Sequence, residues 1–372
     1  MQTIRDFKLE RYFGKYEFAV DWLLSPSDCE TMTIPELLAL ADDEGQTLWN
    51  DLALGYTESP GHPLLRAEIA QLYQQVAADQ IVVAAPEELI LIAMHSLLAP
   101  GDHLIHIAPA YQSLYAVAQS IGCAVTPWPL TVAGNRWTVD LEQLEAAITQ
   151  RTKLLVINFP HNPTGFLPDR VTLDAIIAIA RSHRLTIFSD EMYRLLEYDR
   201  ATRLPAVCDL YEDAISLSGM SKTFGLPGLR IGWLATQRAD LPARWLALKD
   251  YTTICNSAPS EILALIGLRA GPQLATRSLA IIRENLQIVE AFCAQQGKLI
   301  QWLSPQAGSV AFPRWLGAEP LDQLCERALA EQGLLIVPSS IFDHAGNHFR
   351  IGLGRRNLPQ VLEHFDTLLS KF

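Results

Sequence analysis

The chain has 372 residues and a formal net charge of −12 at pH 7, and 49% of its residues are hydrophobic. This length allows one large domain with a smaller one beside it, and the hydrophobic share is typical of a globular enzyme. The negative charge argues against nucleic acid or an acidic membrane surface as the main partner. A small anionic ligand is not excluded, because such a ligand responds to local charge.

The chain begins with "MQTIRDFKLERYF", which is charged and lacks the apolar run of a signal peptide. No stretch of about twenty apolar residues predicts a transmembrane helix. The cysteines lie tens of residues apart without a Cys-x-x-Cys pair, which is typical of reduced, mostly buried thiols. We therefore expect a cytoplasmic protein with no membrane partner. The cysteines are Cys29, Cys123, Cys208, Cys255, Cys293 and Cys325.

The histidines form no cluster of metal ligands. His103 and His106 lie in the strand-like stretch "HLIHIA", and His344 and His348 lie on either side of a glycine. Either pair could bind a metal ion, but histidines of a core or a surface are commoner, so no metal is expected.

From residue 103 onward, short apolar stretches alternate with helical patterns. Helices are predicted around 111–122 and from Asp169, the expected N-cap residue, through 171–183. Strands that alternate with helices of this length indicate crossover connections and a largely parallel sheet. The predicted strands are 103–108, 123–130, 153–159, 185–190, 213–219 and 229–235.

After about residue 255 the pattern changes. Helical periodicity dominates 261–296, and "GSVAFPRW", a helix near 321–333 and "FRIGLG" follow. We expect three parts: an N-terminal segment, 1–40, that packs on the small domain or on a partner subunit; a large domain, 41–255; and a small α+β domain, 256–372.

Polar residues follow three of the predicted strands. "PHNPTG" with Asn162, "DEMYR" with Asp190 and Tyr193, and "GMSKTFG" with Lys222 each begin where an apolar stretch ends. Each has an ordinary explanation as a turn, a helix cap or a solvated lysine. In an open parallel sheet, however, ligands bind at the carboxyl ends of the strands. Their joint placement therefore favours a functional site.

A lysine that forms a Schiff base needs a carbonyl partner and a lowered pKa. Arg230 offers a nearby positive charge and a fork for phosphate. Pyridoxal phosphate is an aldehyde cofactor with a phosphate group, and it needs a carboxylate such as Asp190 at its pyridine nitrogen. Asn162 and Tyr193 could bind its phenolic oxygen, and an aromatic ring should cover its face.

These motifs resemble those of fold type I pyridoxal-phosphate enzymes of the aspartate aminotransferase superfamily, class I/II. "NPTG", "DEMY" and "SKTFGLPGLRIG" occur in the family's order, with "GYTESPGHPLLRAEIA" before them and "FRIGLG" after them. The resemblance covers nearly the whole chain. It implies an α/β fold: a large domain with a mostly parallel seven-stranded sheet flanked by helices, and a smaller α+β domain.

The resemblance also implies roles for individual residues. Lys222 is similar to the Schiff-base lysine that also moves the substrate proton, and Asp190 to the partner of the pyridine nitrogen. Asn162 and Tyr193 correspond to the residues at the phenolic oxygen, and Tyr111 to the aromatic that stacks on the ring.

Phosphate and substrate contacts follow in the same way. Arg230 corresponds to the phosphate-binding arginine, and Arg350, with Asn162, to the groups that bind the substrate carboxylate. Tyr56 is similar to a tyrosine that reaches the phosphate of the neighbouring subunit, which implies a homodimer with shared active sites. Arg355 and Arg356 are rivals of Arg350 that we interpret as structural. Backbone N–H groups at the start of a helix should also bind phosphate; the residues there are Ala85, Pro86, which has no N–H, and Glu87.

The chain departs from the family pattern in three places. Many members have a hydroxyl residue where this chain has Gly219, and Ser218 or Ser221 could take over its contact. The phosphate loop reads "AA" (84–85) instead of a glycine-alanine pair. The stretch "SPSDCETMT" (25–33) lacks the usual Gly-x-Pro of the substrate-binding segment, which affects the substrate more than the cofactor.

The first hypothesis is an aminotransferase acting between an L-amino acid and a 2-oxo acid. The alternative keeps the cofactor but performs elimination or cyclisation, as in the capreomycidine synthase branch, whose members cyclise a hydroxylated arginine, or as in a C–S lyase-like enzyme. A regulatory protein without catalysis is disfavoured, because residues 1–50 are too few for a winged-helix domain and Lys222 and Asp190 are both present. The side chain of the substrate stays open.

Overall fold

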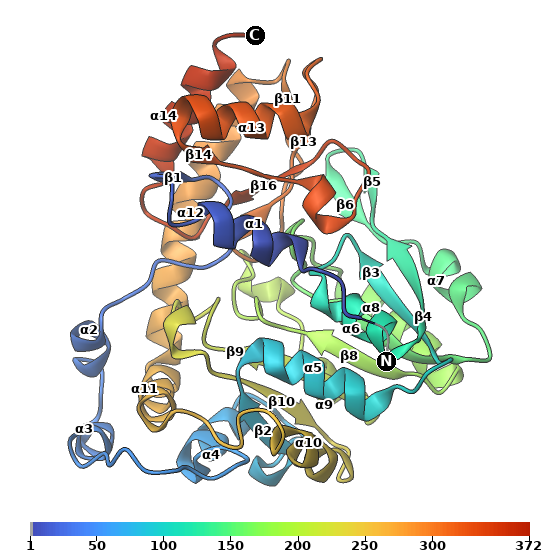
Figure 1. Cartoon of the computed structure of the whole chain (residues 1–372), viewed down its shortest axis with the longest axis vertical. Coiled ribbons are helices and arrows are strands. Elements are labelled where there is room, and N and C mark those ends of the chain that lie inside the picture. Colours follow the sequence, from blue (N-terminus) through green and yellow to red (C-terminus); the bar gives the residue numbers. More distant parts are fainter. Residues whose placement is uncertain (1–2) are drawn as a thin grey trace.

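The computed structural model describes residues 3–372 and has a seven-stranded sheet at its centre (Figure 1). The strand order is β2-β10-β9-β8-β7-β3-β4. β10 runs antiparallel to both of its neighbours, and all the other neighbouring strands are parallel. The prediction of a mostly parallel seven-stranded sheet is thus confirmed. The strands are β2 (Ile81–Ala84), β3 (His103–Ala108), β4 (Ala124–Pro129), β7 (Thr152–Asn158), β8 (Thr186–Asp190), β9 (Ala214–Gly219) and β10 (Gly232–Thr236).

Six of these strands lie where the sequence predicts them, and two differences are informative. The seventh strand, β2, has four residues and was not assigned, since so short an apolar run precedes a helix without a clear break. The strand predicted at 229–235 begins only at Gly232. Pro227–Leu229 forms a 3₁₀ turn, and Arg230 follows with a φ of 55° in the left-handed region, which interrupts an extended strand.

Both faces of the sheet are buried. In β7, Leu154 and Val156 belong to one hydrophobic core, whereas Leu155 and Ile157 belong to the other. Successive side chains of a strand point to opposite faces, so a strand covered on both sides is a continuous apolar run. This is why the central strands can be found from the sequence.

Helices cover the two faces. α5 (Pro86–Leu97), α6 (Ser113–Ile121) and α10 (Leu241–Lys249) contribute to the first core. The second core includes residues of α4 (Pro63–Ala70), α7 (Leu141–Ala147), α8 (Arg170–Ser182), α9 (Val207–Leu210) and α11 (Ala258–Arg269). α8 begins as predicted, because the side chain of Asp169 accepts a hydrogen bond from the backbone N–H of Thr172 at 2.7 Å. α2 (Ile34–Leu38) and α3 (Asp43–Asn50) lie against α11.

The C-terminal part forms a second group of helices and small sheets. The long helix α12 (Gly271–Gln295) runs from α11 to α14, in orange in Figure 1. The boundaries proposed between 40 and 41 and between 255 and 256 stay a prediction. The other elements are α13 (Leu321–Gln332), α14 (Leu358–Leu369), β11 (Ile300–Gln301), β12 (Val310–Ala311), β13 (Arg314–Trp315), β14 (Leu334–Leu335), β15 (Val337–Pro338) and β16 (Phe349–Gly352).

The N-terminal segment lies between these two groups of elements, in dark blue in Figure 1. β1 (Trp22–Leu23) pairs in parallel with β14, and the Tyr12 hydroxyl of α1 (Lys8–Tyr16) donates to the carbonyl of Ile336 at 2.9 Å. No helix within residues 3–372 has both the length and the hydropathy to cross a membrane. The remaining elements are a hairpin of β5 (Thr131–Ala133) and β6 (Arg136–Thr138), and 3₁₀ turns at Ala78–Gln80, Arg200–Thr202, Pro227–Leu229 and Ser339–Phe342.

Candidate active site

A pocket of about 660 Å³ lies at the carboxyl ends of the central strands. It collects most of the residues to which the sequence assigned a role. Those from the sheet and its first helices are Pro86, Glu87, Tyr111, Asn162, Asp190 and Tyr193. Those from later segments are Ser221, Lys222, Arg230 and Arg350. Residues that are far apart in the chain therefore share one cavity, as the strand-end argument predicts.

Two predicted residues lie elsewhere. Ala85 is the N-cap of α5 and does not line the pocket itself, although the helix that it opens points its first turn there. The side chain of Tyr56 is 95% exposed in the single chain and borders a separate hollow of about 290 Å³. Its predicted contact with a neighbouring subunit stays a prediction.

Lys222 follows β9 and points its amine into the pocket. Its Nζ donates to the Ser27 hydroxyl at 2.8 Å. Burial lowers the pKa of Lys222, Asp28 raises it, and the nearby guanidinium of Arg350 lowers it again. We expected Arg230 to be the cation responsible. Arg230 is instead exposed and donates to the carbonyl of Pro227 at 3.2 Å.

Asp190 is the last residue of β8 and is buried in the pocket wall. Burial raises its pKa to about 6, while the backbone N–H of Met192, 3.1 Å from Oδ1, and the charge of Lys222 lower it. A carboxyl group in this position gains stability from a positively charged partner. Asp190 can therefore bind a protonated nitrogen.

Arg350 lies in β16 with a side chain that is only 1% exposed. Its Nε donates to the carbonyl of Ser25 at 3.0 Å, and its Nη1 donates to Asn162 Oδ1 at 3.2 Å. Burial lowers its pKa. No carboxylate of residues 3–372 forms an ion pair with this guanidinium, so it can still bind an anionic ligand.

Two hydroxyl groups of the pocket are buried without a partner. They are the Tyr193 Oη and the Ser221 Oγ, and neither forms a hydrogen bond within the described chain. A buried hydroxyl without a partner costs free energy. Both atoms therefore indicate a polar ligand that completes the site.

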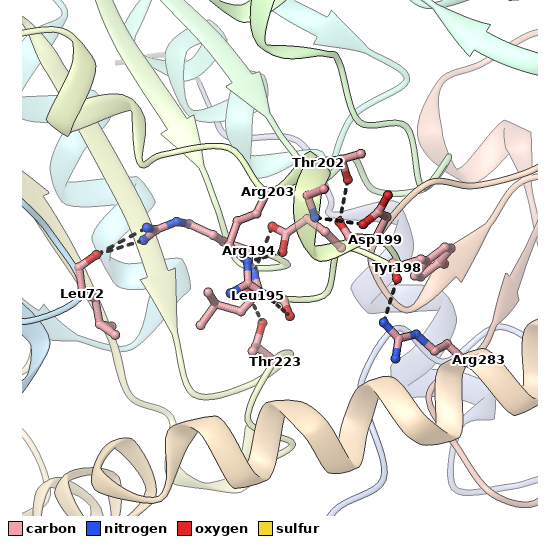
Figure 2. Close-up of polar contacts among 11 residues, drawn as sticks. Leu72, Arg194, Leu195, Tyr198, Asp199, Thr202, Arg203, Thr223 and Arg283 are labelled. Carbon is pink, nitrogen blue, oxygen red and sulfur yellow. Dashed lines mark hydrogen bonds and ion pairs between the residues drawn. The ribbon is translucent and has the colours of Figure 1, made fainter.

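The strand-end loops are held together by hydrogen bonds outside the pocket (Figure 2). Thr223, next to Lys222, donates its hydroxyl to the carbonyl of Arg194 at 2.7 Å. The Arg194 guanidinium in turn donates to the carbonyl of Leu72 at 3.3 Å. The loop that carries Lys222 is thereby fixed against the loop that carries Asp190 and Tyr193.

The structure explains why a glycine, Gly219, stands where many family members have a hydroxyl residue. A β-carbon there would lie 2.9 Å from the Cα of Gly232 and 2.9 Å from the carbonyl oxygen of Ile231, because β9 and β10 pair closely at this point. A hydroxyl residue at this position would force the strands apart. Of the two candidates that could replace it, Ser221 lines the pocket and Ser218 does not.

The structure adds detail to two further predictions, the stacking aromatic residue and the helix start that should bind phosphate. The Tyr111 hydroxyl donates to Glu10 Oε1 at 2.7 Å, so the predicted stacking residue is fixed by the N-terminal helix. α5 begins with a proline and has no side-chain cap, which leaves the N–H groups of its first turn for a ligand. Burial raises the pKa of Glu87 in this turn to about 7.

Sequence reasoning missed two residues of the site. Ser27 contacts the amine of Lys222 although it is 195 residues away in the chain. Asn158 accepts the backbone N–H of Asn162 at 2.8 Å and donates to the carbonyl of Asp190 at 2.9 Å, so it links two strand ends. Asn158 lies in the predicted strand 153–159, two residues before "PHNPTG", and could have been considered, whereas no spacing rule points to Ser27.

The histidines of the two pairs contact protein groups. His103 forms hydrogen bonds with Thr152 at 2.7 Å and Thr126 at 2.8 Å. His344 and His348 pack with aromatic rings. No group of three or more potential ligands of a metal occurs within residues 3–372. The six cysteines are free, and five of them are buried.

Comparison with known proteins extends this picture. The sequence model of the family "Aminotransferase class I and II" matches residues 23–365. Capreomycidine synthase of Streptomyces vinaceus is 31% identical over 372 residues, which cover 98% of this chain and 93% of the relative. Glutamate-pyruvate aminotransferase AlaA of Escherichia coli K12 is 37% identical over 342 residues, which cover 86% and 82%.

Solved structures with the same fold are also known. A PLP-dependent aminotransferase from Streptococcus suis superposes with a TM-score of 0.92 at 29% identity, covering 100% of this chain and 99% of the other. The family match spans almost the whole chain and includes every strand of the central sheet. The chain therefore belongs to the aminotransferase class I and II family of pyridoxal-phosphate enzymes.

Proposed function

We propose that this enzyme transfers an amino group between an L-amino acid and a 2-oxo acid, with Lys222 as its reactive amine. One observation carries the proposal: an amine, a buried carboxyl group and a buried guanidinium that has no ion-pair partner within residues 3–372 line the same pocket. Pyridoxal phosphate, when bound, supplies the electron withdrawal that stabilises negative charge at the substrate Cα. The protein has to bind, orient and move protons around that atom.

The residues of the pocket fit this cofactor. The unpartnered Tyr193 Oη, together with Asn162, suits the phenolic oxygen, and the carboxyl group of Asp190 suits a protonated ring nitrogen. The unpartnered Ser221 Oγ, with Arg230 and the first turn of α5, suits the phosphate. These donors lie in one cavity, which supports their assignment as the cofactor-binding residues.

The substrate is held from the other side. Arg350 offers two parallel N–H groups to the α-carboxylate, and Asn162 Oδ1 holds the guanidinium in place. Such a clamp fixes the orientation of the Cα–H bond. The Lys222 amine, whose pKa burial lowers, is then suited to remove the Cα proton as a general base.

Borohydride treatment tests whether the cofactor is attached to Lys222. It should fix the cofactor to the peptide that contains Lys222. Attachment to Lys153 or Lys249 instead would refute the assignment.

A second function has a specific observation in its favour. Capreomycidine synthase matches 98% of this chain, and an elimination or cyclisation would start with the same proton removal in the same pocket. Stoichiometry separates the two. Without a 2-oxo acid acceptor, an aminotransferase releases one 2-oxo acid per site and stops. An elimination or cyclisation enzyme, a C–S lyase-like one included, continues through many turnovers.

We further propose a homodimer with shared active sites. Tyr56 and Leu54 are strongly exposed, and so are Tyr251 and Ile254 on a second loop. The two loops are linked, because the Thr57 hydroxyl donates to the carbonyl of Asn256 at 3.0 Å. A second copy would cover this apolar surface. Light scattering should give a dimer mass, and Tyr56→Phe should weaken cofactor retention. The cytoplasmic location stays a prediction.

A further inference from the structure

We propose that this enzyme selects amino acids whose side chain carries a positive charge, and that Glu17, beside Asp28, binds that charge. The proposal rests on the proposed function only in assuming that an amino acid binds with its carboxylate on Arg350. It assigns a role to the stretch "SPSDCETMT", where the chain lacks the usual Gly-x-Pro of its relatives.

The first four residues of this stretch form a wall along the substrate position. The Ser25 carbonyl accepts from Arg350 Nε at 3.0 Å, and the Ser27 hydroxyl accepts from Lys222 Nζ at 2.8 Å. The wall therefore extends from the carboxylate clamp to the reactive amine. Asp28 follows Ser27 in the chain and also lines the pocket.

The remaining wall of the pocket determines where a substrate side chain lies. The carboxylate is bound by Arg350, and the ring-binding residues occupy the strand ends. The side chain must leave toward the part of the pocket that residues 9–17 and 26–28 line. In this part Glu10, Glu17 and Asp28 are acidic, and Arg11 is the one basic residue among those that line it.

Among these carboxylates, Glu17 has no partner. Asp28 accepts two hydrogen bonds from Arg355, at 3.2 and 2.9 Å, and Glu10 accepts one from the Tyr111 hydroxyl. The side-chain carboxyl group of Glu17 forms no hydrogen bond or ion pair within residues 3–372, although the residue is half-buried. Burial raises its pKa, Asp28 and Glu10 raise it further, and the positive charges of Arg355 and Lys222 lower it.

A cationic side chain would relieve this arrangement. An unpaired, half-buried carboxylate beside two others is unfavourable, and a charged hydrogen bond to an ammonium or guanidinium group compensates for the desolvation. An acidic side chain would be repelled, and a neutral one would leave Glu17 buried without a partner. The same pocket holds the buried, unpartnered Tyr193 Oη, which we assign to the cofactor, so the cavity that Glu17 lines is one that a ligand enters.

The test uses matched pairs of ligands on the cofactor-loaded enzyme. Arginine is compared with citrulline, in which a neutral ureido group replaces the guanidinium, and lysine with norleucine. Dissociation constants come from the change in the cofactor's absorption and so do not depend on turnover. We expect the cationic member of at least one pair to bind ~10-fold or more tightly than its neutral counterpart.

Glu17→Gln should remove most of this preference and leave the binding of the neutral ligand nearly unchanged. The matched control is Glu363→Gln, which changes an exposed carboxylate of α14 that also lacks a side-chain partner within residues 3–372; it should preserve the preference. Equal binding of charged and neutral ligands, or a preference that survives Glu17→Gln, would overturn the proposal.

The outcome is separable from that of the proposed function. An enzyme that transaminates neutral and cationic amino acids equally would keep the proposed function and refute this inference. An enzyme that prefers cationic ligands but needs no 2-oxo acid for sustained turnover would refute the transfer and support the inference.

Discussion

Two walls of the same pocket have different origins. One consists of the ends of β7, β8 and β9, where Asn162, Asp190 and Lys222 follow strands that pair with one another. The other consists of the N-terminal residues 9–28, which contact these groups across more than half of the chain. The first wall contains the groups that react and the second contains the groups that face the substrate side chain. Chemistry and selectivity thus come from segments that can change separately.

The largest effect is expected for Lys222→Ala. Because the amine both attaches the cofactor and moves the Cα proton, turnover should fall by ~10³-fold or more. The half-buried side chain makes one hydrogen bond, so the thermal unfolding temperature should change little. Lys153→Ala, which changes an exposed residue near the start of β7, is the control, and it should keep both values. Normal turnover without the Lys222 amine would contradict the claim that the wall at the ends of β7, β8 and β9 contains the reacting groups.

Asp190→Asn should cost ~10²-fold or more in turnover, because an amide cannot stabilise a protonated ring nitrogen while charge develops at Cα. The same change should not destabilise the apoenzyme. Steady-state kinetics and denaturant unfolding, measured on the same preparations, separate these two effects. A variant with normal turnover would contradict the role of Asp190.

The difference in stability between the wild-type and Asp190→Asn apoenzymes should also depend on pH in a defined direction. The folded-state pKa of Asp190 is raised to about 6 from 3.8, so the folded state binds its proton more tightly than the unfolded state. The stability that this proton contributes is complete below pH 3.8 and is lost as the pH rises through about 6. Above that range the charged group costs about 1–3 kcal/mol. Asparagine avoids this cost. At neutral pH the free energy of unfolding of the variant apoenzyme should therefore be higher than that of the wild type.

The contrast between the walls also shows what the sequence could predict. β7 contains the continuous apolar run 154–157, and apolar residues fill the middle of β8 and much of β9, because both of their faces are buried. The polar residues that cluster at their ends are therefore conspicuous. β2 was missed because four residues carry too little pattern. Ser27 and Glu17 were missed for another reason: they reach the pocket only when β1 pairs with β14 and α1 packs against the 3₁₀ turn Ser339–Phe342. Local spacing contains no information about such a contact.

Arg350 joins the two walls, because its guanidinium donates hydrogen bonds to both Asn162 and the carbonyl of Ser25. In Arg350→Lys, lysine keeps the charge but not the planar fork, so binding of amino acids should weaken by about 2 kcal/mol. Amines that lack the carboxylate should bind as they do to the wild type. Dissociation constants for an amino acid and its decarboxylated amine measure the difference. An equal loss for both would mean that Arg350 shapes the pocket and does not read the carboxylate.

The smallest effect is expected for Ser27→Ala, which tests whether the N-terminal wall also affects the chemistry. The Ser27 hydroxyl accepts a hydrogen bond from Lys222 Nζ and so favours the charged ammonium form. Its loss should lower the pKa of Lys222, and the effect should be small because one such bond contributes only about 0.5–1.5 kcal/mol. The rate at which the apoenzyme attaches its cofactor depends on the neutral amine, so its pH profile should move toward acid. Ser27→Thr retains the hydroxyl and should restore the wild-type profile. If Ser27→Ala leaves the profile in place, the N-terminal wall acts on the substrate alone, and the division between the two walls is sharper than the contact with Lys222 implies.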